Sequence, residues 1–317
     1  MNQVTLCNRG DELRNRKKAI IWKRLLECWQ LYVLILPAFV YIILFHYLPM
    51  YGIVIAFQDY NPAKGFFGTF VGFKHFSSFF NSPQFWNLIK NTVIINFYAI
   101  ILCFPMPVLL ALLLNEAKQL WLKKLVQNLT YFPFFISTVV IVGMLSAFLS
   151  PSIGIVNTMI KFLGINAIDF MGKAEWFRSV YIISGLWQNT GWSSIIFLAA
   201  LSTIEQELHE AAKMDGAGRI KRIWHINIPG IMPTIIILFI LNCGGILNVG
   251  FEKIFLMQNS LNLSVSEVIS TYVYKIGIQG AKFSYSTAIG LFNSIINFML
   301  LLAVNKVSKK LSDISLF

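Results

Sequence analysis

The sequence predicts an all-α integral membrane protein with six transmembrane helices. Apolar residues make up 56% of its 317 residues and charged residues only 13%, a balance typical of membrane proteins rather than soluble domains. Crossing the hydrocarbon core takes roughly 20 apolar residues per helix. The stretches that reach this length without any Asp, Glu, Lys or Arg are residues 31–57, 91–114, 130–149, 179–204, 231–250 and 285–304.

Basic residues predict the orientation, because Lys and Arg favour cytoplasmic loops. They are concentrated before the first stretch, in the second and fourth loops, and after the sixth stretch, for example at Arg16, Lys123, Arg219 and Lys309. Both termini of this multi-pass membrane protein are therefore expected in the cytoplasm. The first apolar run is too long for a cleavable signal peptide, so it is expected to remain as the first helix.

The chain is expected to form one membrane domain with short polar ends. The predicted parts are a basic segment at the inner membrane interface over residues 1–30, the membrane domain over residues 31–305, and a cytoplasmic tail over residues 306–317. The net charge of +12 is attributed to topology and anionic-lipid contacts, and nucleic acid is not an expected partner. The histidines show no metal-ligand spacing, so neither a metal site nor a catalytic cluster is predicted.

A polar, charged hairpin over residues 203–229 separates the fourth and fifth apolar stretches. Ser202 and Thr203, with Glu205 and Gln206 three residues later, predict a helix that starts with a capping box. Gly216 is expected to end that helix. Residues 219–225 predict a second short helix before the chain re-enters the membrane at Pro229.

The spacing within this hairpin resembles the cytoplasmic signature of permease subunits of bacterial ABC importers. It reads E-A-A, three residues, G, nine residues, I-x-[L/I]-P, with Ile228 at the usual Leu position. The resemblance implies a type I ABC importer permease fold, in which the hairpin is a coupling helix that docks onto a separate ATPase. The coupling residues it implies are Glu210, Ala211, Ala212, Asp215, Gly216, Ile226 and Pro229.

The sequence contains no G-x-x-x-x-G-K-[ST] phosphate loop, the backbone cradle that binds nucleotide phosphates in many ATPases. ATP and magnesium are therefore expected on a partner ATPase, and no cofactor is expected in this chain. The chain itself is predicted to be non-catalytic.

Further stretches are similar to the LplB-like oligosaccharide permeases, relatives of the maltose-type importers. They include residues 47–52 (YLPMYG), 56–60 (AFQDY), 249–255 (VGFEKIF) and 271–274 (TYVY). This resemblance implies a heterodimer with a second permease subunit, two ATPase subunits below it, and an extracellular lipid-anchored solute-binding protein. The cargo it implies is an oligosaccharide.

A sugar site requires amide or hydroxyl groups and an aromatic face. The uncharged polar and aromatic residues of the spans that meet this need are Trp187, Gln188, Asn189, Trp192, Asn242, Asn248 and Asn293. Each also has a simpler role open to it. Asparagines commonly form interhelical hydrogen bonds, and tryptophans are enriched at the membrane interface.

Other functions remain open from the residues alone. An ion-coupled secondary transporter normally needs an ionisable residue within the membrane, and the six stretches contain no Asp, Glu, Lys or Arg. A membrane enzyme needs a catalytic constellation, which the spans also lack. An ABC importer permease for an amino acid, a peptide or an ion remains the nearest alternative.

Overall fold

The computed structural model describes residues 29–65 and 68–312. Most of the predicted interfacial segment at residues 1–30, and the tail beyond residue 312, lie outside the described residues. The chain forms two units, residues 1–55 and 56–317, and each is described by itself.

The first unit is an apolar helix that becomes irregular toward its end. Helix α2 (Trp29–Ile42) contains Pro37 and continues into a π-helical turn (Ile43–Tyr47), α3 (Leu48–Met50) and a 3₁₀ segment (Tyr51–Phe57). The irregular part of this unit therefore begins after Ile42.

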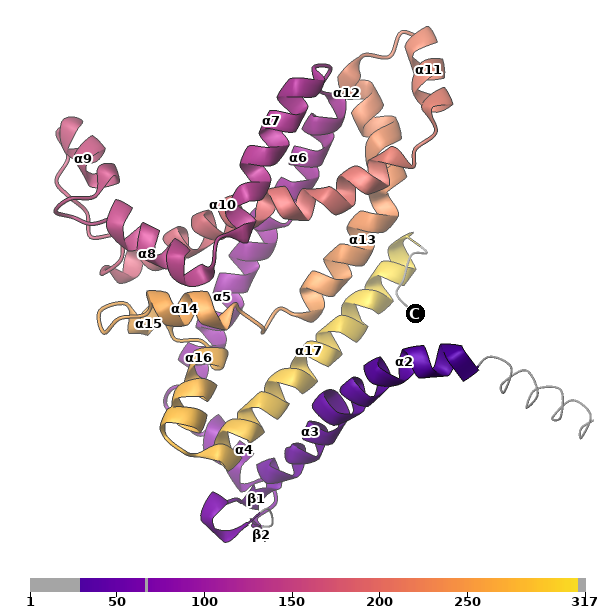
Figure 1. Ribbon diagram of the computed structural model, residues 1–317. Coiled ribbons are helices and arrows are strands. Elements are labelled where there is room, and N and C mark those ends of the chain that lie inside the picture. Colours follow the sequence, from indigo (N-terminus) through magenta and orange to yellow (C-terminus); the bar gives the residue numbers. More distant parts are fainter. Residues whose placement is uncertain (1–28, 66–67, 313–317) are drawn as a thin grey trace, which may run out of the picture. The chain divides into compact units, whose positions relative to one another are not determined.

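The second unit begins with a small antiparallel sheet, in which β1 (Gln58–Asp59) pairs with β2 (Thr69–Phe70). Helices make up most of the unit from there to Ser312 (Figure 1). They are α4 (Lys74–Phe80), α5 (Phe85–Cys103), α6 (Pro105–Glu116), α7 (Leu120–Tyr131), α8 (Thr138–Phe148), α9 (Ile155–Phe162), α10 (Ala174–Ser202), α11 (Gln206–Met214), α12 (Arg219–Arg222), α13 (Ile228–Gly244), α14 (Phe251–Met257), α15 (Leu263–Ser266), α16 (Ile269–Tyr274) and α17 (Phe283–Ser312).

Two prolines in the chain follow a widened helical turn. The backbone N–H of Leu48 bonds the carbonyl of Ile43 just before Pro49, and that of Ile228 bonds the carbonyl of Ile223 just before Pro229. Proline has no N–H for the carbonyl four residues earlier, and its ring crowds that carbonyl. A π-helical turn relieves the crowding without ending the helix.

Among the described residues, four helices are long and apolar enough to cross a membrane: Trp29–Phe57, Phe85–Glu116, Arg219–Gly244 and Phe283–Lys310. The stretch predicted at residues 130–149 is not one straight helix, because Leu120–Phe135 and Thr138–Phe148 meet at 102°. Pro133 and the extended backbone at Ile136 separate the two parts. The predicted fifth stretch is helical only to Gly244, not to residue 250. The count of six spans stays a prediction.

Helix α10 is the central element of the second unit. It packs against α5, α6, α7, α13 and α15, and Figure 1 shows it crossing α6 and α7. A Cβ atom at Gly191 would collide with the backbone carbonyl of Thr130, so the glycine allows α10 to approach the end of α7 closely. Small residues serve this purpose between membrane helices.

Much of the apolar surface is not covered within this chain. Only 22% of the apolar window of Phe85–Glu116 and 17% of that of Phe283–Lys310 is buried. Contiguous exposed apolar surface of this extent indicates contact with lipid or with another subunit.

Replacing Gly191 by alanine should destabilise the protein, because the added methyl group meets backbone that cannot rotate away. Overpacking of this kind costs about 1–3 kcal/mol. Thermal unfolding of the detergent-purified subunit measures the effect. Gly143→Ala is the matched control, since a Cβ atom there has open space around it. Equal unfolding temperatures for the two variants would contradict this account of the α7–α10 contact.

Candidate functional site

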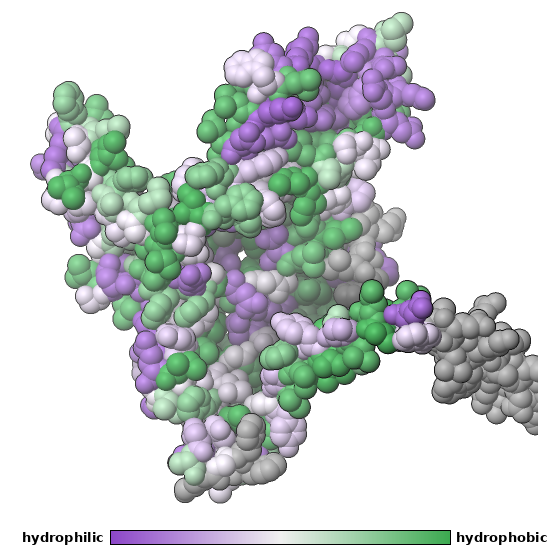
Figure 2. Space-filling model, viewed as in Figure 1, coloured by the Kyte–Doolittle hydropathy of each residue, from purple (hydrophilic) through white to green (hydrophobic). Residues whose placement is uncertain are grey.

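The hairpin that carries the E-A-A spacing lies at one exposed end of the second unit. Glu210, Ala211 and Asp215 are exposed, and Ala212 is half-buried. Figure 2 shows hydrophilic residues gathered over this end, around α11, α12 and α7. The Glu210 carboxylate accepts a hydrogen bond from the Gln206 side chain at 3.1 Å, one turn earlier on α11.

Gly216 ends α11 in the left-handed conformation that the sequence predicts for a terminal glycine. Its φ is +76°, and a residue with a Cβ is strained there. The Gly216 N–H bonds the carbonyl of Lys213 at 3.0 Å, and the Ala217 N–H bonds that of Ala212 at 2.8 Å. These bonds satisfy the last carbonyls of the helix.

The predicted start of this helix is wrong. The helix begins at Gln206, and Glu205 caps it without a side-chain hydrogen bond. The hydroxyls of Ser202 and Thr203 bond the carbonyls of Ala199 and Ala200 at 2.7 and 2.8 Å. They serve the end of α10 instead of a capping box, because a short hydroxyl side chain readily bonds a carbonyl of its own helix.

The predicted second short helix at residues 219–225 is also not a separate element. The chain runs from α12 through the π-helical turn at Ile223–Asn227 into α13, which makes one helix of Arg219–Gly244. Ile226 is half-buried within that turn, and Pro229 is exposed just after it. The hairpin is therefore joined to a predicted span by continuous helix.

Glu116, at the end of α6, ties this part of the chain to the membrane domain. Its carboxylate accepts a hydrogen bond from Arg222 at 3.4 Å and one from the buried Asn227 at 3.5 Å. The side chains of Arg222 and Glu116 are 13% and 17% exposed. Sequence reasoning missed this cluster. The only sign of it in the sequence is that Glu116 closely follows the apolar stretch at residues 91–114.

The hairpin also exposes large apolar side chains. Met214 is 89% exposed, Ile220 74% and Trp224 64%. Large apolar groups gathered on a polar, solvent-facing segment indicate a protein contact.

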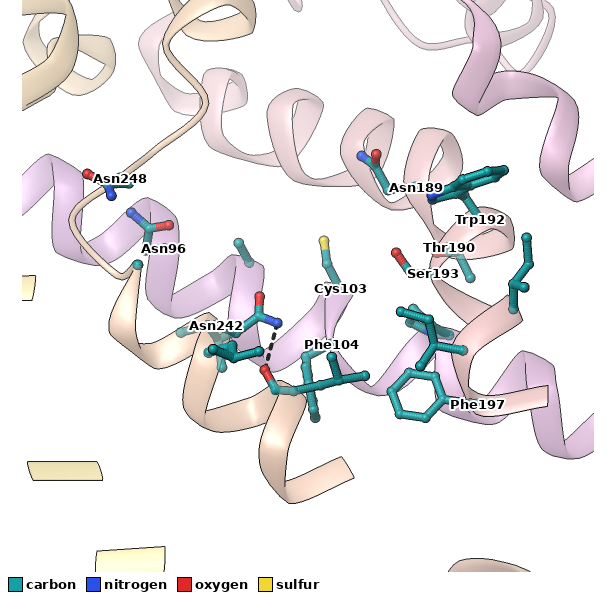
Figure 3. Close-up of a pocket in the computed structure, with 18 residues that line it drawn as sticks. Asn96, Cys103, Phe104, Asn189, Thr190, Trp192, Ser193, Phe197, Asn242 and Asn248 are labelled. Atoms are coloured by element: carbon teal, nitrogen blue, oxygen red, sulfur yellow. Dashed lines mark hydrogen bonds between the residues drawn. The ribbon is translucent and has the colours of Figure 1, made fainter. Parts of the chain in front are cut away.

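A cavity of about 780 Å³ lies between α5, α6, α10, α13 and the segment that follows α13. Its wall combines apolar side chains with Trp192, Phe104 and Phe197 and with a set of uncharged polar groups (Figure 3). The polar groups are Asn96, Asn189, Thr190, Ser193, Asn242 and Asn248. Apolar and aromatic walls with a few placed hydrogen-bonding groups are typical of small-molecule sites.

Three of these asparagines are held in the same way. Asn96, Asn189 and Asn242 each donate from the side-chain nitrogen to the carbonyl four residues earlier, at 3.1, 2.9 and 3.0 Å. Each bond uses the amide nitrogen and leaves the amide oxygen as an acceptor beside the cavity. Trp192 is held by stacking on Phe134, with ring centroids 4.5 Å apart and 3° between the planes.

The structure brings together four of the seven sequence-predicted cargo residues, Asn189, Trp192, Asn242 and Asn248. Trp187 and Gln188 do not line the cavity, because their positions turn away from the face that carries Asn189. Gln188 instead reaches the carbonyl of Ile136 at 3.4 Å.

Asn293 also lies outside the cavity wall. It donates to the side-chain oxygen of Asn248 at 3.0 Å, and Asn297 donates to the same oxygen at 3.1 Å. Asn297 accepts in turn from the N–H of Leu247 at 3.0 Å. This cluster attaches α17 to the non-helical segment after α13, which is the interhelical role that the sequence left open.

The most unexpected residue near the cavity is Lys253 on α14. It lies just after the predicted fifth apolar stretch, outside all six stretches, yet the structure buries it to 8% exposure. Burial without a carboxylate partner lowers its pKa to about 8, since desolvation disfavours the ammonium. Its neighbours Ile254 and Met257 belong to a core cluster with Ile95 and Phe177.

Apolar helices with a polar cavity between them, and a polar hairpin exposed at one end, define a membrane transport subunit. The family described as "Binding-protein-dependent transport system inner membrane component" matches residues 66–313. The chain belongs to this family, and it is a non-catalytic permease subunit of an ABC importer with the type I permease fold.

The comparisons with individual proteins agree with this family. Protein LplB of Bacillus subtilis is 44% identical over 303 residues, which cover 95% of each chain. The polygalacturonan/rhamnogalacturonan transport system permease YteP of the same organism is 44% identical over 299 residues, covering 94% of this chain and 92% of that one. A chain of a bacterial ABC transporter that imports the acidic polysaccharide alginate superposes with a TM-score of 0.85 at 39% identity. The match covers 92% of this chain and 99% of that one.

Replacing Arg222 by methionine should loosen the hairpin, because the Glu116 carboxylate loses its charged partner in a poorly solvated place. Leaving such a group unsatisfied costs roughly 1–3 kcal/mol. Limited trypsin digestion, read as cleavage after Lys213 and Arg219, should proceed faster than in the wild type. Lys221→Met removes a neighbouring exposed charge and should leave that rate unchanged. Equal rates for both variants would show that the Glu116 cluster does not hold the hairpin.

Proposed function

We propose that this chain forms the translocation path for an oligosaccharide together with a second, related permease subunit, and that two ATPase subunits drive it. A lipid-anchored solute-binding protein delivers the cargo from outside the cell. The observation that carries the proposal is the cavity of about 780 Å³ whose wall combines amides, hydroxyls and aromatic rings. Sugars are bound by such hydrogen-bonding groups together with an aromatic face. In this proposal the hairpin and both termini face the cytoplasm.

The cavity and the hairpin support one mechanism of alternating access. Helix α10 carries Asn189 and Trp192 on the cavity wall and ends at Ser202, and three residues separate it from the start of α11 at Gln206. Helix α13 carries Asn242 and is continuous with the other side of the hairpin. A displacement of the hairpin by the ATPase subunits is therefore passed to two walls of the cavity.

The exposed face of the hairpin supports ATPase docking. Ala211 has a short side chain, Gly216 has none, and a Cβ atom at Gly216 would meet nothing within 4 Å in this chain. Space that this chain does not fill allows a partner surface to approach closely. The exposed Met214 and Ile220 offer apolar contact area beside it.

Glu210→Lys and Gly216→Trp should abolish uptake while the protein stays in the membrane. The first reverses the charge at the docking face. The second places a bulky ring where the ATPase approaches and also strains the turn, because Gly216 has a φ of +76°. Uptake of labelled oligosaccharide by cells, with membrane abundance measured in parallel, tests both. Glu175→Lys makes the same charge change at an exposed position in the first turn of α10 and should leave uptake intact. Wild-type uptake in both hairpin variants would reject the docking role.

Cysteine cross-linking identifies the partner at the hairpin directly. Met214→Cys places a thiol at a position that is 89% exposed. It should capture an ATPase subunit of the assembled importer, and Met159→Cys on α9, at 62% exposure, should not. Capture from α9 alone would contradict the proposed orientation.

Asn189→Ala and Trp192→Ala should each raise the KM for uptake, because each removes a contact group from the cavity wall. A lost hydrogen bond or ring contact of about 1 kcal/mol corresponds to a several-fold change. Trp187→Ala is the control, since that ring lies on the same helix but outside the wall. If all three variants show the same KM as the wild type, the cargo does not bind in this cavity.

A further inference from the structure

Lys253 is a buried cation without a counter-charge among the residues that the structure describes. Its ammonium has no hydrogen-bond partner among the described residues, and none of the ion pairs found there includes it. Glu252 is adjacent in sequence, but its side chain is exposed. Glu267, in the same part of the fold, pairs with Lys275 at 3.0 Å. A buried charge without a partner is costly to maintain.

The contacts that Lys253 does make are weak. The ammonium lies 5.4 Å from the centre of the Tyr181 ring, a cation–π distance that compensates only part of the lost hydration. It also lies 3.7 Å from the place that a Cβ atom of Gly185 would occupy. The absence of a side chain at Gly185 leaves a gap on α10 beside the ammonium.

This gap is next to the cavity. Tyr181, Gly185 and Asn189 are spaced four residues apart and so follow one face of α10. The Asn189 side chain lines the cavity and bonds the carbonyl of Gly185 at 2.9 Å. The thiol of Cys103, which is close enough to Lys253 to interact with it electrostatically, lines the cavity as well. Gly185, the residue beside the ammonium, is therefore one helical turn along α10 from a residue of the cavity wall.

The lysine keeps its charge in this place at neutral pH. Desolvation lowers its pKa to about 8, which still leaves most of the side chain protonated at pH 7. The stem of a lysine is flexible, so rotation about its bonds can carry the ammonium past Gly185 to the cavity. A carboxylate there would provide the counter-charge that Lys253 does not find within residues 29–65 and 68–312.

We propose that Lys253 binds a carboxylate of the cargo at the edge of the cavity, so that the transported sugar is an acidic oligosaccharide built with uronic acid residues. This inference rests on the proposed function, because it assigns a charge to the oligosaccharide that passes through the same cavity. Lys253 then acts as a specificity residue, since a neutral sugar leaves the ammonium unpaired.

The test compares an acidic cargo with its neutral counterpart in the assembled importer. Cells that contain all its subunits are given a labelled oligogalacturonate and the carboxyl-reduced oligosaccharide of equal length. Lys253→Met should lower kcat/KM for the acidic cargo by about tenfold, while any uptake of the neutral cargo changes by less than twofold. The solute-binding protein is the same in both strains. Its own preference therefore cancels when the acidic-to-neutral ratio is compared between them.

Two further variants make the result specific. Lys173→Met removes an exposed lysine at the start of α10 and should leave the ratio unchanged. Gly185→Ala fills the gap beside the ammonium without changing any charge, and a methyl group fits there without a clash. It should lower acidic uptake selectively. It also keeps the inference testable if Lys253→Met does not accumulate in the membrane.

The outcomes separate the two proposals. Uptake of neither cargo by the wild type would reject the proposed function for these sugars. Uptake of the acidic cargo with an unchanged ratio in both Lys253→Met and Gly185→Ala would overturn the role of Lys253 alone. An equal loss of both cargoes in Lys253→Met would also overturn it, since that result identifies the lysine as a structural contact, for example with the second permease subunit.

Discussion

The arrangement of the second unit depends on α10, a helix rich in polar side chains among apolar neighbours. Such a helix is stable there only if its polar groups are satisfied. Thr190 and Ser194 meet this condition with bonds of 2.6 Å to carbonyls of their own helix. Gly191 lets α10 lie against the backbone of Thr130. Asn189 and Ser193 of the same helix line the cavity.

The same helix connects the two ends of the proposed mechanism. It runs from near Lys253 and the cavity to the polar hairpin, and α13 returns from the hairpin to the other side of the cavity. Helix α6 also contributes to the cavity wall. Glu116, at its end, binds Arg222 and Asn227, which lie in the continuous helix that leads from the hairpin into α13. Three walls of the cavity are thus attached to the segment that the proposal assigns to the ATPase contact.

Local features of the fold were predictable because they depend on neighbouring residues. The E-A-A spacing predicted the hairpin, and Gly216 ends α11 with the positive φ expected of a terminal glycine. The prediction was wrong where one side chain has two possible hydrogen-bond partners close to it in the chain. Ser202 and Thr203 are good capping residues, yet their hydroxyls bond α10. Pro133 divides an apolar run that hydropathy alone describes as one span.

The sequence by itself determined that this is a helical membrane protein of the permease family, with apolar spans and a polar hairpin between two of them. These properties follow from hydropathy and from the backbone chemistry of Gly and Pro, which act over a few residues. Only the tertiary structure decided that Asn189 and Asn242 share a cavity while Asn293 binds Asn248. It alone placed Lys253 in the interior. The surroundings of such a side chain come from helices far apart in the chain, and no local pattern records them.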